Sequence, residues 1–188
     1  KMPNGRVIIY AAGDSILAYD RTTKRSTLIT RGFDLYLSMS PLGDRIAYFR
    51  QSEDGKSAMP WTIALDPATG APTGPAPRVS TRSGDQPGLS PDGKLLAYFA
   101  DLGTSEQGQD LVVIPATGGT ERIVAHYDWS SDVKGINAPM WSADGKWIYV
   151  SVTGDSATSV ERIPATGGKR ERVFSHIPRG EGFHSSIG

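Results

Sequence analysis

The sequence has no cysteine, only three histidines among its 188 residues, and no net charge. Without cysteine there can be no disulfide framework, no thiolate metal site and no cysteine nucleophile, although either an oxidising or a reducing compartment remains possible. Twenty basic residues balance twenty acidic ones, so the chain lacks the positive charge typical of proteins that bind nucleic acid or membrane surfaces. We therefore expect no nucleic-acid partner.

Long apolar runs are also missing. The longest are six residues, at 7–12 and 95–100, whereas a membrane-spanning helix needs about 20. We expect no membrane insertion and no signal peptide within these residues. Hydrophobic residues make up 38% of the chain and charged residues 21%, which is the composition of a globular protein with one ordinary domain or two small ones.

A nine-residue motif recurs along the chain. The segment SPDGKLLAY at 90–98 returns as SADGKWIYV at 142–150 and SPLGDRIAY at 40–48, and more weakly as MPNGRVIIY at 2–10. A second motif keeps the same phase, with DRTTK at 20–24, DPATG at 66–70 and PATGG at 115–119 and 164–168. Two motifs in phase over four copies indicate a repeat protein.

Each motif predicts a tight turn between two strands. Proline favours the first corner of a type I turn, glycine supplies a positive φ, and a β-branched or aromatic run follows at once. Each repeat therefore consists of four short antiparallel strands, the first of which precedes the motif serine. Helical periodicity is nearly absent.

Tandem four-stranded units of about 45 residues predict an all-β protein, a β-propeller built of four-stranded antiparallel blades. A sandwich would lack turns in phase, and a solenoid would use shorter repeats. The motifs resemble the repeat of the TolB-like, WD-like propeller family, which is also similar to blades of prolyl-oligopeptidase-like peptidases. The repeat units are 2–39, 40–89, 90–141 and 142–184, and a fifth motif starts at 185–188.

The number of blades leaves three possibilities. Propellers that this chain resembles have roughly six to eight blades, but the sequence divides into only four units. The chain is a segment of a larger ring, or self-association completes the ring, or four blades close alone. We favour one of the first two, because an open arc would expose apolar blade faces.

Long connections are expected on the face opposite the short turns, where binding residues usually lie. In the connection at 126–134, Tyr127, Asp128 and Trp129 are contact candidates because aromatic side chains dominate interface energies. Trp129 could equally fill a blade junction. Arg179 and Glu181 lie in the connection at 177–182. Asp85 and Asn137 each precede a motif serine by five residues and either line the tunnel or cap strand ends.

We expect no metal, no other cofactor and no catalytic residue in this chain. His126 and His176 occupy similar positions in successive blades, too far apart to share one ion, whose ligands lie at about 2 Å. The segment HSSIG at 184–188 is better explained as the fifth turn motif than as a hydrolase nucleophile elbow.

Three functions follow from the resemblance. The first is a non-catalytic module that binds a protein or peptide through its long-loop face and central tunnel. The second is the substrate-gating propeller of a prolyl-oligopeptidase-like serine hydrolase whose catalytic domain lies outside this chain, and the third is a propeller lyase or glycan-active enzyme. The TolB-like resemblance also implies a periplasmic or other extracytoplasmic location.

Overall fold

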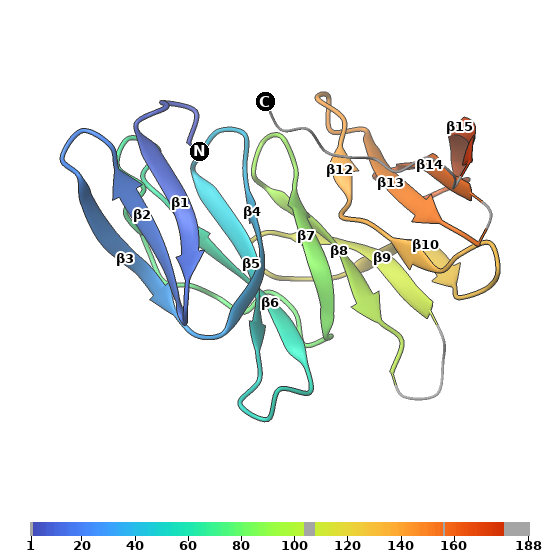
Figure 1. Cartoon of the computed structure of the whole chain (residues 1–188), viewed down its shortest axis with the longest axis horizontal. Helices are drawn as coiled ribbons and strands as arrows, with labels where there is room; N and C mark the ends of the chain where they lie inside the picture. Colours follow the sequence, from blue (N-terminus) through green and yellow to red (C-terminus); the bar gives the residue numbers. More distant parts are fainter. Residues whose placement is uncertain (1, 104–107, 156, 179–188) are drawn as a thin grey trace.

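The computed structural model describes residues 2–103, 108–155 and 157–178, and every regular element in this part of the chain is a β-strand. The strands form four antiparallel sheets that follow one another in chain order (Figure 1). We call these sheets blades 1 to 4. Among the described residues they form an open arc, so the prediction of an all-β partial propeller is confirmed.

The blades are built from consecutive strands. Blade 1 contains β1 (Val7–Ala12), β2 (Ser15–Asp20) and β3 (Arg25–Arg31), and blade 2 contains β4 (Asp34–Met39), β5 (Arg45–Gln51) and β6 (Ala58–Ala64). Blade 3 contains β7 (Gly84–Leu89), β8 (Leu95–Asp101), β9 (Gly108–Pro115) and β10 (Arg122–Asp128). Blade 4 contains β11 (Gly135–Ile136), β12 (Met140–Trp141), β13 (Trp147–Thr153), β14 (Ala157–Pro164) and β15 (Glu171–Pro178).

The serine motif forms the predicted turn. In blade 3 the Gly93 amide donates to the carbonyl oxygen of Ser90 (2.9 Å), and Gly93 has a φ of 69°. The Ser90 hydroxyl accepts the amide of Leu95 (2.9 Å) and donates to Asp92 (2.7 Å). The copy at residues 142–147 repeats these contacts. The motif begins with serine because its hydroxyl hydrogen-bonds both the aspartate of the turn and the first amide of the next strand.

Three blades depart from the expected four continuous strands. In blade 2 the fourth strand is reduced to two isolated bridges, Trp61 with Arg78 and Leu65 with Pro72, because Pro72, Pro75 and Pro77 have no amide hydrogen to donate to a ladder. In blade 1 no first strand pairs with β1 among the described residues. In blade 4 the first strand is split into β11 and β12, which both pair with β13.

The core lies between blades rather than within them. Three buried clusters occupy the junctions of blades 1 and 2, 2 and 3, and 3 and 4. Equivalent positions of the second strands, Ile46, Leu96 and Ile148, are fully buried at these junctions. Each internal blade is therefore held by apolar contacts on both of its faces.

Candidate binding groove

The first strands of blades 2, 3 and 4 lie next to one another and line an apolar groove of about 700 Å³. The lining residues come from the same repeat positions in each blade. Three residues before the motif serine stand Leu37, Pro87 and Pro139, and one residue before it stand Met39, Leu89 and Trp141. The rest of the lining is formed by Pro41, Pro91 and Ala143, which follow the motif serines, and by Ser38, Gly88, Ala138 and Met140.

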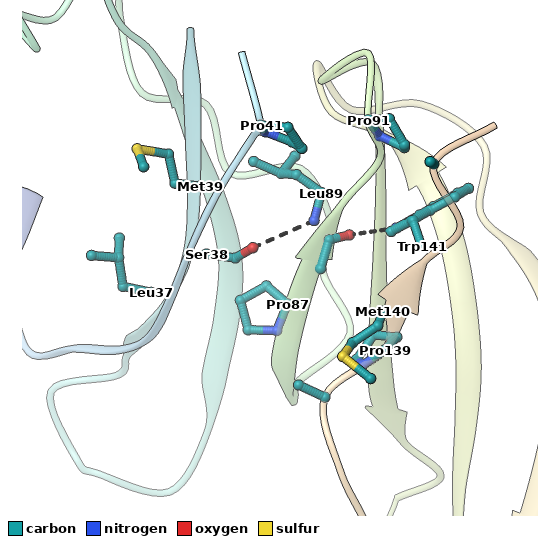
Figure 2. A pocket seen from close by; sticks show the side chains of 13 residues that line it. Leu37, Ser38, Met39, Pro41, Pro87, Leu89, Pro91, Pro139, Met140 and Trp141 are labelled. Atoms are coloured by element: carbon teal, nitrogen blue, oxygen red, sulfur yellow. Dashed lines mark hydrogen bonds between the residues drawn. The ribbon is translucent and has the colours of Figure 1, made fainter. Parts of the chain in front are cut away.

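Hydrogen bonds between the first strands fix the groove. The Trp141 indole N–H donates to the carbonyl oxygen of Gly88 (2.9 Å), and the Leu89 amide donates to Ser38 Oγ (3.4 Å), as Figure 2 shows. The Trp141 ring thus has its only polar atom satisfied by blade 3, and its apolar surface faces the groove. This arrangement gives the groove a fixed wall before any ligand binds.

Irregular backbone shapes the strands beside the groove. The β4–β5 pairing shifts register between Leu35 and Ser38, and the β7–β8 pairing shifts between Asp85 and Gly88. Tyr36 and Gln86, at the same repeat position, have φ values of 54° and 55°. Residues other than glycine rarely adopt this conformation, which is typical of bulges that redirect a strand. Each bulge directly precedes a groove residue, Leu37 or Pro87.

A glycine lets blades 3 and 4 approach at the groove. A Cβ atom on Gly88 would overlap the carbonyl oxygen of Pro139. Because the missing side chain leaves room for blade 4, Gly88 is required by the close approach of two backbones.

The predicted contact residues Tyr127, Asp128 and Trp129 lie in different environments in the structure. The Tyr127 side chain is 1% exposed and packs in the junction of blades 3 and 4, edge-on to Phe99 with ring centroids 5.9 Å apart. Burial raises the pKa of its hydroxyl, and the charge of Glu161 adds to this effect. Tyr127 is therefore core, and its assignment as a surface contact is wrong, because alternation along β10 turns it inward.

The neighbours of Tyr127 behave differently. Asp128 ends β10, is exposed, and its carboxylate lies 2.9 Å from His126 Nε2. Trp129 is half-buried and packs against the same cluster as Tyr127, which favours its role as a junction residue. Arg179 and Glu181 lie outside the described residues.

Asp85 and Asn137 do not line the groove. Asn137 is exposed, and its backbone N–H donates to the carbonyl oxygen of Ser151 (3.0 Å). Asp85 is half-buried, and its Oδ1 has no hydrogen-bond partner among the described residues. Burial, followed by the charge of Asp101, raises the pKa of the Asp85 carboxyl. Both residues stand two positions before the groove residues Pro87 and Pro139, on the side away from the serine turns.

Sequence reasoning missed the groove, although a signal was present. The residues one and three positions before each motif serine are apolar in blades 2, 3 and 4. The column of Met39, Leu89 and Trp141 lines the groove. The groove lies beside the serine turns and not among the long connections, which were one of the two places, with the central tunnel, where we expected binding.

The described residues contain no cluster of three or more histidine or acidic side chains suited to a metal ion. In the same residues no helix has the length and apolarity needed to cross a membrane.

Comparison with known structures identifies the fold. TolB from Acinetobacter baumannii superimposes with a TM-score of 0.62 over 91% of this chain at 20% identity, covering 41% of TolB. The β-propeller domain of the Trilobed protease from Pyrococcus furiosus gives 0.60 over 91% of this chain at 14% identity, covering 53% of that chain. The chain has the TolB-like β-propeller fold.

Sequence comparison adds one relative. No family model matches the chain. An uncharacterized protein of Agrobacterium fabrum is 31% identical over 137 residues, which are 72% of this chain and 41% of the relative. The TolB-like propeller described here thus spans about two fifths of the curated relative and of Acinetobacter TolB.

Proposed function

We propose that this propeller segment is a non-catalytic binding module whose groove takes an extended stretch of a protein or peptide. The observation that carries the proposal is the apolar groove at the inner strands of three blades. Pockets of about 300–1,000 Å³ lined mainly by apolar side chains are typical ligand sites. The groove, at about 700 Å³, falls within this range.

The chemistry of the lining supports an apolar segment rather than a charged ligand. Its side chains are aliphatic, proline, methionine and tryptophan, with Ser38 as the polar exception, and Ser38 Oγ is already hydrogen-bonded to Leu89. A charged ligand would lose its hydration here without gaining a partner. Met140 is 62% exposed, and flexible methionines adapt well to varied apolar partners.

A library of random 12-residue peptides displayed on phage tests the proposal. Enriched peptides should bind the wild-type protein and should bind Leu37→Asp and Met140→Asp at least tenfold more weakly, because each change places a carboxylate in the groove. A tenfold loss corresponds to about 1.4 kcal/mol. Leu42→Asp is the matched control, since Leu42 is exposed in the adjacent serine turn but does not line the groove.

Two outcomes would refute this role. If no peptide is enriched, peptide binding is wrong; if enriched peptides bind all four proteins equally, the groove is not their site. The gating portion of a serine hydrolase stays an alternative proposal, supported by the likeness to the Trilobed protease propeller. An extracytoplasmic location remains a proposal that rests on the likeness to TolB.

A further inference from the structure

The first strands of blades 3 and 4 are joined by side chains. In the part of the chain that the structure describes they belong to separate sheets, so no backbone ladder runs between them. The Gln86 amide Nε2 donates to the carbonyl oxygen of Ile136 (3.1 Å). The Trp141 indole N–H donates in the opposite direction, to the carbonyl oxygen of Gly88 (2.9 Å). Each blade therefore both donates and accepts one hydrogen bond.

These two bonds enclose the part of the groove that blade 4 contributes, which we call the blade 4 wall. On blade 4 the bonds are attached at Ile136 and Trp141, and between these residues lie Ala138, Pro139 and Met140, which all line the groove. The stretch is irregular, because the first strand of blade 4 is interrupted between β11 and β12. A hydrogen bond at each end therefore restricts where the blade 4 wall lies relative to blade 3.

Gln86 adopts a backbone conformation that is unfavourable for glutamine. Its φ is 55°, in the left-handed region that residues other than glycine rarely adopt. The next residue is Pro87, and a residue before proline favours extended backbone. Glycine would fit this φ without strain. The presence of glutamine instead points to a role for its side chain, since strained residues of this kind concentrate at functional sites.

Blade 2 offers a comparison at the same repeat position. Tyr36 has nearly the same φ as Gln86, 54°, but its side chain is 53% exposed. The first strands of blades 2 and 3 are linked by the longer hydrogen bond from the Leu89 amide to Ser38 Oγ (3.4 Å). The groove is therefore held more firmly between blades 3 and 4 than between blades 2 and 3, and Gln86 supplies one of the two bonds that hold it there.

We propose that Gln86 is a positioning residue for the groove, whose amide holds the blade 4 wall in the geometry that binds a peptide. The proposal rests on the proposed function, because it concerns the same groove. Gln86 does not itself line the groove, so it acts through the wall and not by touching the ligand. A wall that is fixed in advance lowers the cost of ordering side chains and backbone when a ligand binds.

Two substitutions separate the hydrogen bond of Gln86 from the bulk of its side chain. Gln86→Met keeps the length but has no donor, whereas Gln86→Lys has a donor long enough to reach the Ile136 carbonyl. The dissociation constants of the phage-selected peptides should rise about fivefold for Gln86→Met, which is within the effect of one lost neutral hydrogen bond. They should stay within about twofold of the wild type for Gln86→Lys, because the bond is restored.

Gln51→Met is the matched control. Gln51 Nε2 donates to the carbonyl oxygen of Gly55 (3.0 Å), so this change removes a bond of the same kind outside the groove. Its peptide affinities should equal those of the wild type. Affinities are compared at a temperature where circular dichroism shows every variant to be folded, and Gln86→Ala serves if Gln86→Met does not fold.

The exchange of the Trp141 indole N–H with solvent, measured by NMR, tests the wall without any peptide. Its signal is identified by its absence in Trp141→Phe. Because the bonds of Gln86 and Trp141 hold the same segment, losing one should let the segment open more often. We therefore expect exchange at least about threefold faster in Gln86→Met, and an unchanged rate in Gln86→Lys and Gln51→Met.

Three results would overturn the proposal. Unchanged Trp141 exchange in Gln86→Met would mean that the wall does not depend on Gln86. Faster exchange with unaltered peptide affinity would mean that the ligand does not need a fixed wall, and an equal loss of affinity in Gln86→Lys would mean that the donor is irrelevant. If no peptide binds the wild type, the proposed function fails, and the exchange rate of Trp141 alone decides whether Gln86 holds the wall.

Discussion

His126 lies between two carboxylates at the end of β10. Its Nδ1 is 2.9 Å from Asp110, and its Nε2 is 2.9 Å from Asp128. These hydrogen bonds, with that to Asp110 the stronger cause, raise the pKa of the imidazole. Arg82, whose guanidinium is 2.8 Å from the other oxygen of Asp110, competes for the same carboxylate. Arg82, which precedes β7, is thus tied to β9 and β10 by this group.

The raised pKa gives this group a pH-dependent effect on stability. A histidine whose pKa is higher in the folded than in the unfolded state contributes its stabilisation in full below the unfolded value of about 6.5. The contribution is lost as the pH rises through the folded pKa. We expect His126→Gln to lower the urea midpoint of unfolding at pH 5.5 and to have a much smaller effect at pH 9. An equal effect at both pH values would show that the charge of His126 contributes nothing.

Asp85 is a residue whose burial brings no gain in the described fold. Its buried Oδ1 lacks a partner and its carboxyl pKa is raised, so ionisation of Asp85 opposes folding. Perturbed carboxyls of this kind are more frequent at functional sites than elsewhere. Asp85 was predicted as a site residue from its place before the motif serine, and this environment keeps it a candidate although it lies outside the groove.

At the scale of the strands, Gly88 joins blade 3 to blade 4. We expect Gly88→Ala to destabilise the protein by about 1–3 kcal/mol, the usual cost of an overpacked contact. The new Cβ would displace the Pro139 carbonyl and break the hydrogen bond from the Trp141 indole N–H to the Gly88 carbonyl oxygen. The change should therefore also lower the affinity of the groove for peptides.

Gly135→Ala is the control for this prediction. A Cβ on Gly135 meets no atom within 4 Å. Gly135 lies in β11, in the first-strand segment of blade 4. Thermal unfolding of both variants measures the difference. Equal stability of Gly88→Ala and Gly135→Ala would mean that the two backbones can move apart at no cost.

The strands and turns were predictable because their determinants are local. Serine, proline and glycine at fixed spacing determine the turn, and the apolar run after Gly93 determines β8. The loss of a fourth strand in blade 2 was also readable from the prolines at 72, 75 and 77, but the repeat pattern led us to expect four strands there.

The groove was not predictable in the same way. An apolar residue before each motif serine is compatible with core or with a cavity wall, and only the spacing between adjacent blades decides between them. The same ambiguity explains Tyr127, whose place at the end of a strand rather than in a loop depends on how far β10 continues. Packing of separate strands, unlike turn chemistry, is not encoded in any short segment.

At the scale of the whole molecule, the buried clusters of the described residues join blades that follow one another in the chain, as repeats do in solenoids. Blades 2 and 3 are covered on both faces, whereas blades 1 and 4 are covered on one face among the described residues. Stability against local opening should follow this coverage, because few buried contacts mean a low opening free energy. Strands β8 and β9 are the most completely buried, and β1 and β3 carry many exposed residues.

Hydrogen–deuterium exchange of the protein tests this gradient. Amides of β8 and β9 should exchange at least tenfold more slowly than those of β1, β2 and β3, and amides of β13 and β14 should fall between, because blade 4 retains the large junction with Phe99 and Tyr127. Uniform protection along the chain would mean that the arc unfolds as one unit, so that the junctions transmit stability to the end blades and the coverage of a blade face does not determine its local stability.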